Sequence, residues 1–180
     1  MSTEAGTRLV RQSAPRGALS PTIPSTSSSR LTDATSKVWP RCAGWVPVMA
    51  DEAVLDARDA LRAVRLRACD LINIKLMKCG GLLAALTLDA VAETAGVGCQ
   101  IGTMVESSVA SAAGLHLALA LHNAATVEMG GPIMLAEDVG GLRAYYEHDR
   151  VTVPEGSGLG VEPDEAILKR YAVERAWITA

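Results

Sequence analysis

The sequence has no excess of positive charge. Its 17 lysines and arginines are balanced by 20 aspartates and glutamates, which gives a formal net charge of −3 at pH 7. Proteins that bind nucleic acids or anionic membrane surfaces concentrate basic side chains, and that electrostatic pattern is missing here. We therefore expect a small-molecule partner, and neither a nucleic acid nor a membrane.

Long apolar runs and paired cysteines are also missing. A membrane-spanning helix needs roughly 18 or more consecutive apolar residues, and a secretory signal needs an uninterrupted apolar core near the N-terminus. Neither pattern occurs, so we expect a cytoplasmic protein. The four cysteines show no CxxC spacing, and we expect them to be reduced and structural; they are Cys42, Cys69, Cys79 and Cys99.

Residues 1–44 differ in composition from the rest of the chain. The segment Ser13–Ser36 is dense in serine, threonine and proline and shows neither a helical nor a strand period. Such a segment cannot bury enough apolar area to offset the entropy lost on ordering. We expect a disordered tail over 1–44 and one folded domain over 45–180. An organelle transit peptide is the weaker alternative, because Glu4 and the prolines do not suit one.

From Trp45 onward, short apolar strands alternate with alanine-rich helices. The expected strands cover 45–52, 68–75, 97–103 and 125–128, and the expected helices cover 53–65, 80–96 and 107–123. The strands end at Asp51, Lys75, Thr103 and Glu128, at intervals of 24, 28 and 25 residues. This is about the length of one βα unit, so the sequence predicts an α/β fold that forms part of a (β/α) barrel.

The apolar pattern also predicts which side chains are buried. In the helix over 80–96, we expect one buried face made of Leu82, Leu83, Leu86, Ala90 and Val91. In the strands, we expect the barrel interior to be lined by Val48, Ile72, Ile74 and Ile101.

The stretch INIKLMKCGG, residues 72–81, ends an apolar strand with a lysine. In a parallel βα barrel, side chains at the carboxyl ends of the strands project into the site, and partial desolvation lowers the pKa of a lysine there. Lys75 is therefore a candidate for proton abstraction. The alternative is a lysine at a strand edge whose ammonium extends into solvent. We expect Lys78, three residues further on, to be solvated.

Five segments together resemble the C-terminal barrel half of the enolase superfamily. They are PVMADEAV, INIKLMKCGGL, GTMVESSVASAAGLHLALAL, VEMGGPIMLAEDV and VPEGSGLGVEPDE, and they cover roughly Trp45 to Asp164. They look most like the mandelate racemase and muconate lactonizing enzyme group, and NIKLMKCGG is most similar to its dipeptide epimerases. The resemblance implies a divalent metal, normally Mg²⁺, which stabilises the enolate formed when a base removes the proton α to a carboxylate.

The resemblance also implies roles for individual residues. Asp51 matches a metal-ligating carboxylate at the fifth barrel strand, and Lys75 matches the acid/base lysine of the sixth. Glu52 follows the ligand, and we expect it to orient the Asp51 carboxylate without binding the metal itself. Glu106 and Glu128 match acidic positions after the seventh strand and at the eighth, where we expect contacts with the substrate. For Glu106, an interaction of its charge with the N-terminus of the following helix is the alternative.

The sequence departs from the family pattern in two places. Dipeptide epimerases usually carry an Asp-x-Asp pair at the eighth strand, whereas this chain reads Glu128, Met129 and Gly130, which is closer to the cycloisomerases. The second lysine base and two earlier metal carboxylates of the family have no counterpart in residues 1–44.

Taken together, these patterns predict an isomerase that acts on a small carboxylate substrate. The first expectation is an epimerase or racemase of dipeptides of the Ala-Glu type or of amino-acid derivatives, and a muconate-type cycloisomerase is the alternative. A truncated, non-catalytic remnant is the alternative of another class. Because only about half a barrel is present, we expect either a homo-oligomer or a complementary barrel half to complete the site.

Overall fold

The computed structural model describes residues 9–11 and 47–173. Its main element is a parallel sheet in the order β2-β3-β4-β5, made of β2 (Met49–Ala50), β3 (Leu71–Ile74), β4 (Gly98–Ile101) and β5 (Ala124–Val127). Between successive strands run α2 (Ala57–Leu66), α4 (Leu82–Thr94) and α5 (Ser108–Ala120). The predicted α/β class and the alternation of strands and helices are confirmed, with shorter strands than expected.

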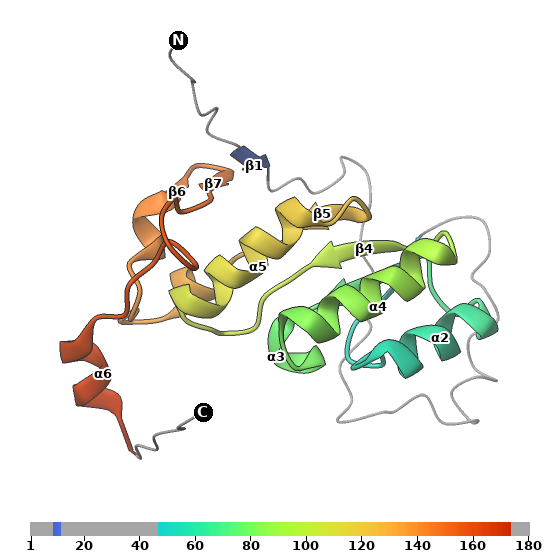
Figure 1. The fold of residues 1–180 in the computed structure, drawn as a ribbon, viewed down its shortest axis with the longest axis horizontal. Helices are drawn as coiled ribbons and strands as arrows, with labels where there is room; N and C mark the ends of the chain where they lie inside the picture. Colours follow the sequence, from blue (N-terminus) through green and yellow to red (C-terminus); the bar gives the residue numbers. More distant parts are fainter. Residues whose placement is uncertain (1–8, 12–46, 174–180) are drawn as a thin grey trace, which may run out of the picture.

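The helices α2, α4 and α5 cover one face of the sheet (Figure 1). The central helix, α4, contacts both α2 and α5 and packs on β3 and β4. A sheet whose crossover helices all lie on one side is the arrangement of a barrel segment, in which the other face of the sheet points to the barrel interior. The outer strands of this four-stranded sheet are β2 and β5.

A second, antiparallel sheet has the order β1-β7-β6 and is made of β1 (Leu9–Arg11), β7 (Arg150–Thr152) and β6 (Tyr146–Glu147). The 3₁₀ helices η1 (Gly131–Met134) and η2 (Leu142–Tyr145) connect β5 to β6, and α6 (Glu165–Tyr171) lies near the C-terminus. Apart from β1, the tail predicted over residues 1–44 lies outside the described residues.

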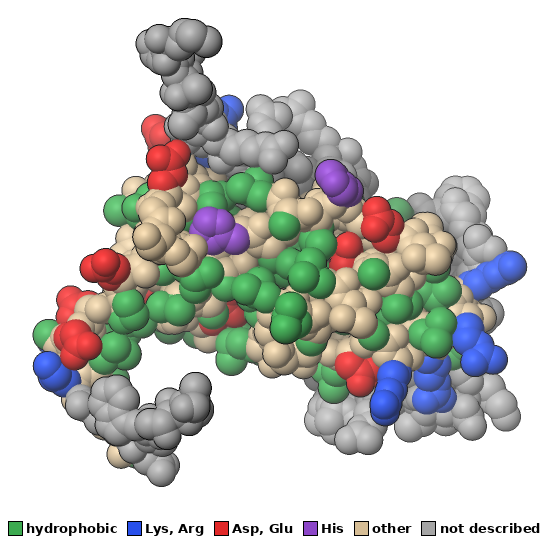
Figure 2. Space-filling model, viewed as in Figure 1, with side chains coloured by type: hydrophobic (Ala, Val, Ile, Leu, Met, Phe, Trp, Pro, Cys, Tyr) green, Lys and Arg blue, Asp and Glu red, His purple; other side chains and the backbone are tan. Residues whose placement is uncertain are grey.

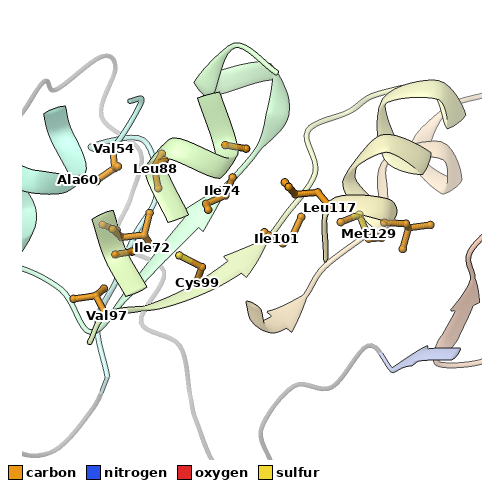
Figure 3. Packing of buried hydrophobic residues seen from close by; sticks show 14 of the residues in the cluster. Val54, Ala60, Ile72, Ile74, Leu88, Val97, Cys99, Ile101, Leu117 and Met129 are labelled. Carbon is orange, nitrogen blue, oxygen red and sulfur yellow. The ribbon is translucent and has the colours of Figure 1, made fainter. Parts of the chain in front are cut away.

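The core lies between the parallel sheet and its helices (Figure 3). Ile72 and Ile74 are fully buried in this core, and they alternate with Asn73, whose side chain bonds to Asp51 on the opposite face. Successive side chains on a strand point to opposite faces, so a strand that directs Asn73 inward must direct both isoleucines toward the helices. The expectation that Ile72 and Ile74 line the barrel interior is therefore wrong.

The same correction applies to β4. The side chain of Ile101 packs toward α5, where its Cγ2 lies 3.9 Å from the place a β-carbon on Gly114 would occupy. Val48, the fourth residue expected in the barrel interior, is only half-buried.

Helix α4 turns a different face inward from the one predicted. Its buried residues are Ala85, Leu88, Asp89 and Ala92, whereas Leu83 is 82% exposed. The prediction failed because this helix is apolar on almost every side, so the sequence does not single out one face. Figure 2 shows apolar side chains across the helix-covered surface. The large exposed apolar side chains of α4 are Leu82, Leu83 and Leu86. Within the described ranges, no helix is both long and apolar enough to cross a membrane.

The cysteines within the described residues are free thiols. Cys99 is buried under the helices, Cys69 and Cys79 are half-buried, and Cys42 lies outside the described residues. Burial raises the pKa of Cys69 to about 11 and also raises the pKa of Cys99. Both thiols are therefore protonated and unreactive at neutral pH.

Candidate active site

The carboxyl ends of the four parallel strands bring the predicted polar residues to one edge of the sheet. Asp51 follows β2, Lys75 follows β3, Thr103 lies two residues beyond β4, and Glu128 follows β5. The clearest contact is between the first two, since Lys75 Nζ donates to Asp51 Oδ2 at 2.8 Å. The structure therefore joins the candidate metal ligand and the candidate base directly, although 24 residues separate them.

The Asp51 carboxylate is held by three side chains. Besides Lys75, Asn73 Nδ2 donates to Oδ2 at 3.0 Å, and Lys78 Nζ donates to Oδ1 at 2.5 Å. Burial by itself would raise the pKa of Asp51, but the hydrogen bonds and charges of the two lysines outweigh burial and hold that pKa below its usual value. Asp51 is therefore an ionised carboxylate at neutral pH, as a metal ligand must be.

Lys78 is not solvated as predicted. Its side chain is only 9% exposed, against 11% for Lys75. Lys78 belongs to α3 (Leu76–Cys79), a single helical turn that begins directly after Lys75. Within this turn the Lys78 amide donates to the Lys75 carbonyl oxygen, which folds Lys78 back under the end of β3.

Glu52 does not take the orienting role that the sequence suggested. It is exposed, and the groups that bond to the Asp51 carboxylate among the described residues are Asn73, Lys75 and Lys78. We did not predict Asn73 as a residue of the site, although its position in the sequence indicates it. It lies two residues before Lys75, and residues two apart on a strand share a face.

Glu106 is buried beside the N-terminus of α5. Ser111 Oγ donates to its Oε1 at 3.1 Å, and the Met104 amide donates to its Oε2 at 3.3 Å. Burial raises the pKa of Glu106 and the nearby charge of Glu128 adds to this, while the two hydrogen bonds and the charge of Lys75 act in the opposite direction. The charges of Lys75 and Glu128, which directly follow β3 and β5, therefore both act on Glu106, which lies in the loop after β4.

The amide in the first turn of α5 is capped by a different carboxylate. Asp138 Oδ1 accepts from the Ser108 amide at 2.8 Å, and its Oδ2 accepts from the Ser108 hydroxyl. Glu106 does not make this contact. Asp138 lies 30 residues further along the chain, so nothing in the local sequence pointed to it.

Glu128 lies at the end of β5 and is exposed. Thr103 fixes the backbone around it: its hydroxyl donates to the Glu128 carbonyl oxygen at 3.4 Å and accepts from the Gly130 amide at 3.2 Å. Nearby, the Tyr146 hydroxyl donates to the Met129 carbonyl oxygen at 2.5 Å. The Thr103 contacts hold the residues after β5 against the end of β4, and the Tyr146 contact ties them to β6.

The donor set fits part of a magnesium site. Asp51 supplies an oxygen ligand of the kind that Mg²⁺ prefers. Among the described residues, however, no group of three or more histidine, cysteine, aspartate or glutamate side chains is placed to hold a metal ion. Asp51 is therefore the candidate metal ligand in this part of the chain. In the same region, Asn73 Oδ1 is buried and has no hydrogen-bond partner among the described residues.

Comparison with protein families gives a match over residues 28–167 to the family described as Enolase C-terminal domain-like. Among curated proteins, the N-succinyl-L-Arg/Lys racemase of Bacillus cereus is 42% identical over 71% of this chain and 34% of its own length. Muconate cycloisomerase 1 of Rhodococcus opacus is 40% identical over 70% of this chain and 34% of its own length.

Solved structures agree with these sequence matches. The crystal structure of the Bacillus cereus racemase has a TM-score of 0.71 and 40% identity, and the match covers 79% of this chain and 37% of that one. A dipeptide epimerase from Enterococcus faecalis, in complex with Mg and the dipeptide L-Leu-L-Tyr, has a TM-score of 0.59 and 37% identity, covering 64% of this chain and 33% of that one. The chain thus spans about a third of the length of the curated relatives it matches.

Proposed function

The chain belongs to the enolase C-terminal domain-like family, and we propose that it supplies half of the active site of an isomerase that removes a proton α to a carboxylate. The observation that carries the proposal is the 2.8 Å contact between Lys75 Nζ and Asp51 Oδ2, at the ends of adjacent parallel strands. A lysine beside a metal-ligating carboxylate is placed to take a proton from a substrate bound at that metal.

Each candidate residue has a separate task in this proposal. Lys75 is the acid/base residue, because Asp51 is its one hydrogen-bond acceptor in the described part of the chain and two of its ammonium hydrogens are left for other partners. Asp51 is a ligand of Mg²⁺, whose charge would offset the negative charge that develops on the substrate carboxylate. Glu106 and Glu128, at the β4 and β5 ends of the site, contact the substrate.

The substrate class follows from the relatives. The racemase of Bacillus cereus is named for N-succinyl-arginine and N-succinyl-lysine, and the Enterococcus faecalis enzyme was solved with a dipeptide. We propose a dipeptide or an N-acylated amino acid as the substrate. A muconate-type cycloisomerase is the second candidate, because Glu128 is followed by Met129 and Gly130 without a second carboxylate, and a muconate cycloisomerase is among the relatives.

The proposal includes a structural partner. A closed barrel needs about eight βα units, and the parallel sheet described here has four strands. Among the described residues, β2 and β5 each have one edge without a partner strand, and the backbone groups of such an edge can pair with a further strand. We propose that a complementary barrel half, or a second copy of this chain, pairs with these edges. A complementary half would also bring the remaining metal carboxylates and the second base.

Reconstitution tests the proposal. The full 180-residue chain is mixed with the separately produced remainder of the Bacillus cereus racemase, about two thirds of that protein, which this chain does not match. Exchange of the substrate α-proton with deuterium is followed by NMR in the presence of Mg²⁺, with N-succinyl-arginine and an Ala-Glu dipeptide. With muconate, the readout is formation of a lactone that carries deuterium from solvent at its α-carbon. Size-exclusion chromatography reports whether the two parts associate.

The expected result is exchange that requires both parts and is lost, by roughly 10²- to 10⁴-fold, in the Lys75→Ala variant. Lys169→Ala is the matched control, because it also removes a lysine ammonium, but an exposed one on α6, 94 residues beyond Lys75 in the sequence. Association without exchange on any substrate would favour a non-catalytic role. Exchange that survives in Lys75→Ala would remove Lys75 from the mechanism.

A further inference from the structure

Two lysines share the Asp51 carboxylate, but they bind it differently. Lys78 Nζ has three acceptors within reach: Asp51 Oδ1 at 2.5 Å, the Asp51 carbonyl oxygen at 2.7 Å and the Asn73 carbonyl oxygen at 3.1 Å. An ammonium group has three hydrogens, so every donor of Lys78 is used within the protein. Lys75 makes a single such contact, to Asp51 Oδ2.

The chain conformation around α3 explains how the two lysines reach opposite oxygens. Lys75 is in extended conformation, with φ −124° and ψ 124°, and so continues the direction of β3. The helical turn that follows returns Lys78 to the same strand end, and Gly80 ends the turn in the left-handed region with φ 93°. The ammonium of Lys78 thereby bridges the main chain after β2 and the main chain of β3.

We propose that Lys78 is the positioning residue of this site: it holds the Asp51 carboxylate by Oδ1, so that Oδ2 is the oxygen that faces Lys75. This inference rests on the proposed function, in which Asp51 binds the metal and Lys75 moves the proton. It assigns to Lys78 a task that Glu52 was expected to perform, and it explains why the second lysine of the KLMK sequence is buried.

The geometry does not allow Lys78 to be the proton-transferring group itself. Burial lowers the pKa of Lys78, although the hydrogen bond and charge of Asp51 act in the opposite direction, and a lowered pKa alone would also suit a base. A base, however, must aim a nitrogen lone pair at the substrate. The nitrogen of Lys78 is surrounded by three acceptors of the protein, and loss of a proton would leave one of them without a donor.

The first test uses the full chain alone, without metal or substrate. The sequence contains four lysines, so ¹⁵N-lysine labelling gives at most four side-chain ammonium signals. We expect the Lys78 ammonium hydrogens to exchange with water far more slowly than those of Lys169, which lies 62% exposed on α6. In Lys78→Met, the Lys75 signal should shift, because Asp51 Oδ1 becomes available to Lys75.

The control variants separate positioning from general disturbance of the fold. Lys78→Arg keeps a cationic donor beside Asp51 and should leave the Lys75 signal closer to its original position than Lys78→Met does. Lys169→Met should leave the signals of Lys75 and Lys78 in place. A Lys78 ammonium that exchanges as fast as that of Lys169, or a Lys75 signal unmoved by Lys78→Met, would overturn the inference.

The second test uses the reconstituted complex. Lys78→Met should lower kcat for α-proton exchange by about 10- to 100-fold and leave KM unchanged. This is the usual loss when a group that hydrogen-bonds to a metal ligand is removed. The Asp51→Asn/Lys78→Met double variant should be no slower than Asp51→Asn, because Lys78 acts through Asp51. An unchanged kcat in Lys78→Met would limit Lys78 to a structural role and overturn the inference. If the unmodified complex shows no exchange, the proposed function fails and the NMR result alone decides the inference.

Discussion

Gly102 lies so close to Asn73 that a β-carbon at position 102 would overlap the Asn73 side-chain oxygen. The two residues belong to adjacent strand ends, and Asn73 in turn donates to Asp51 Oδ2 at 3.0 Å. Asn73 can therefore occupy its observed position only because residue 102 has no side chain. Since Asn73 holds the Asp51 carboxylate, Gly102 also affects the position of Asp51.

The first prediction concerns Gly102→Ala. The added methyl group would force Asn73 out of place, and overpacking of this kind costs about 1–3 kcal/mol in the free energy of unfolding. Urea unfolding measures the loss. Gly98→Ala is the matched control on the same strand, because a β-carbon there meets its nearest neighbour, Leu71 Cδ2, at 3.6 Å, an ordinary contact distance. Equal stabilities of the two variants would show that Asn73 is free to move aside.

The second prediction concerns the cap of α5. Asp138→Ala removes the acceptor of the Ser108 amide and hydroxyl, and Ser108 is fully buried in the intact protein. An unsatisfied buried donor costs about 1–3 kcal/mol. The neighbouring Glu137→Ala removes only exposed contacts with Arg170 and Tyr171, worth about 0–1 kcal/mol. Thermal unfolding followed by circular dichroism should show the larger loss for Asp138→Ala, and the reverse order would contradict the capping role.

The third prediction is a pH dependence that arises from Glu106. The unfolded chain releases this proton near pH 4.5, and burial raises the pKa of Glu106 in the folded state. Between these two values the folded state binds more protons than the unfolded state, so the free energy of unfolding falls as the pH rises. Glu106→Gln cannot ionise, and its stability relative to the original chain should increase across this window and level off above it.

Urea unfolding at a series of pH values between 4 and 8, at steps of about half a unit, measures this difference. Ser111→Ala provides the control, because it removes a hydrogen bond that lowers the Glu106 pKa, and it should extend the window to higher pH. Parallel stability curves for Glu106→Gln and the original chain would show that Glu106 ionises alike in both states.

The fourth prediction concerns metal binding by the chain alone. Mg²⁺ takes octahedral oxygen coordination. Asp51 is the candidate ligand at the strand ends, and among the described residues no group of three or more histidine, cysteine, aspartate or glutamate side chains could hold a metal ion. We expect calorimetry with MgCl₂ to detect no tight site in the 180-residue chain, and a measurable site after the complementary barrel half is added. Micromolar affinity of the isolated chain, abolished in Asp51→Asn, would show that it holds further ligands of its own.

The sequence by itself determined the order of strands and helices and the pair at the centre of the site. Parallel strands repeat with the length of one βα unit, so polar residues at intervals of 24, 28 and 25 residues had to meet at one edge of the sheet. This was enough to bring Asp51 and Lys75 together. Strand alternation would also have shown that Ile72 and Ile74 face the helices once Lys75 was assigned to the interior.

Only the tertiary structure decided which groups hold that pair in place. In the sequence, Lys78 looks like a solvated lysine after a strand, but one helical turn brings it back to Asp51. Asp138 looks like a surface acid, but its loop packs against the N-terminus of α5, where it accepts from the Ser108 amide. The buried face of α4 was equally undetermined, because an almost uniformly apolar helix fits the sheet by shape, with Ala85 and Ala92 allowing close approach. Such contacts depend on distances between distant segments, and a local sequence pattern carries no information about them.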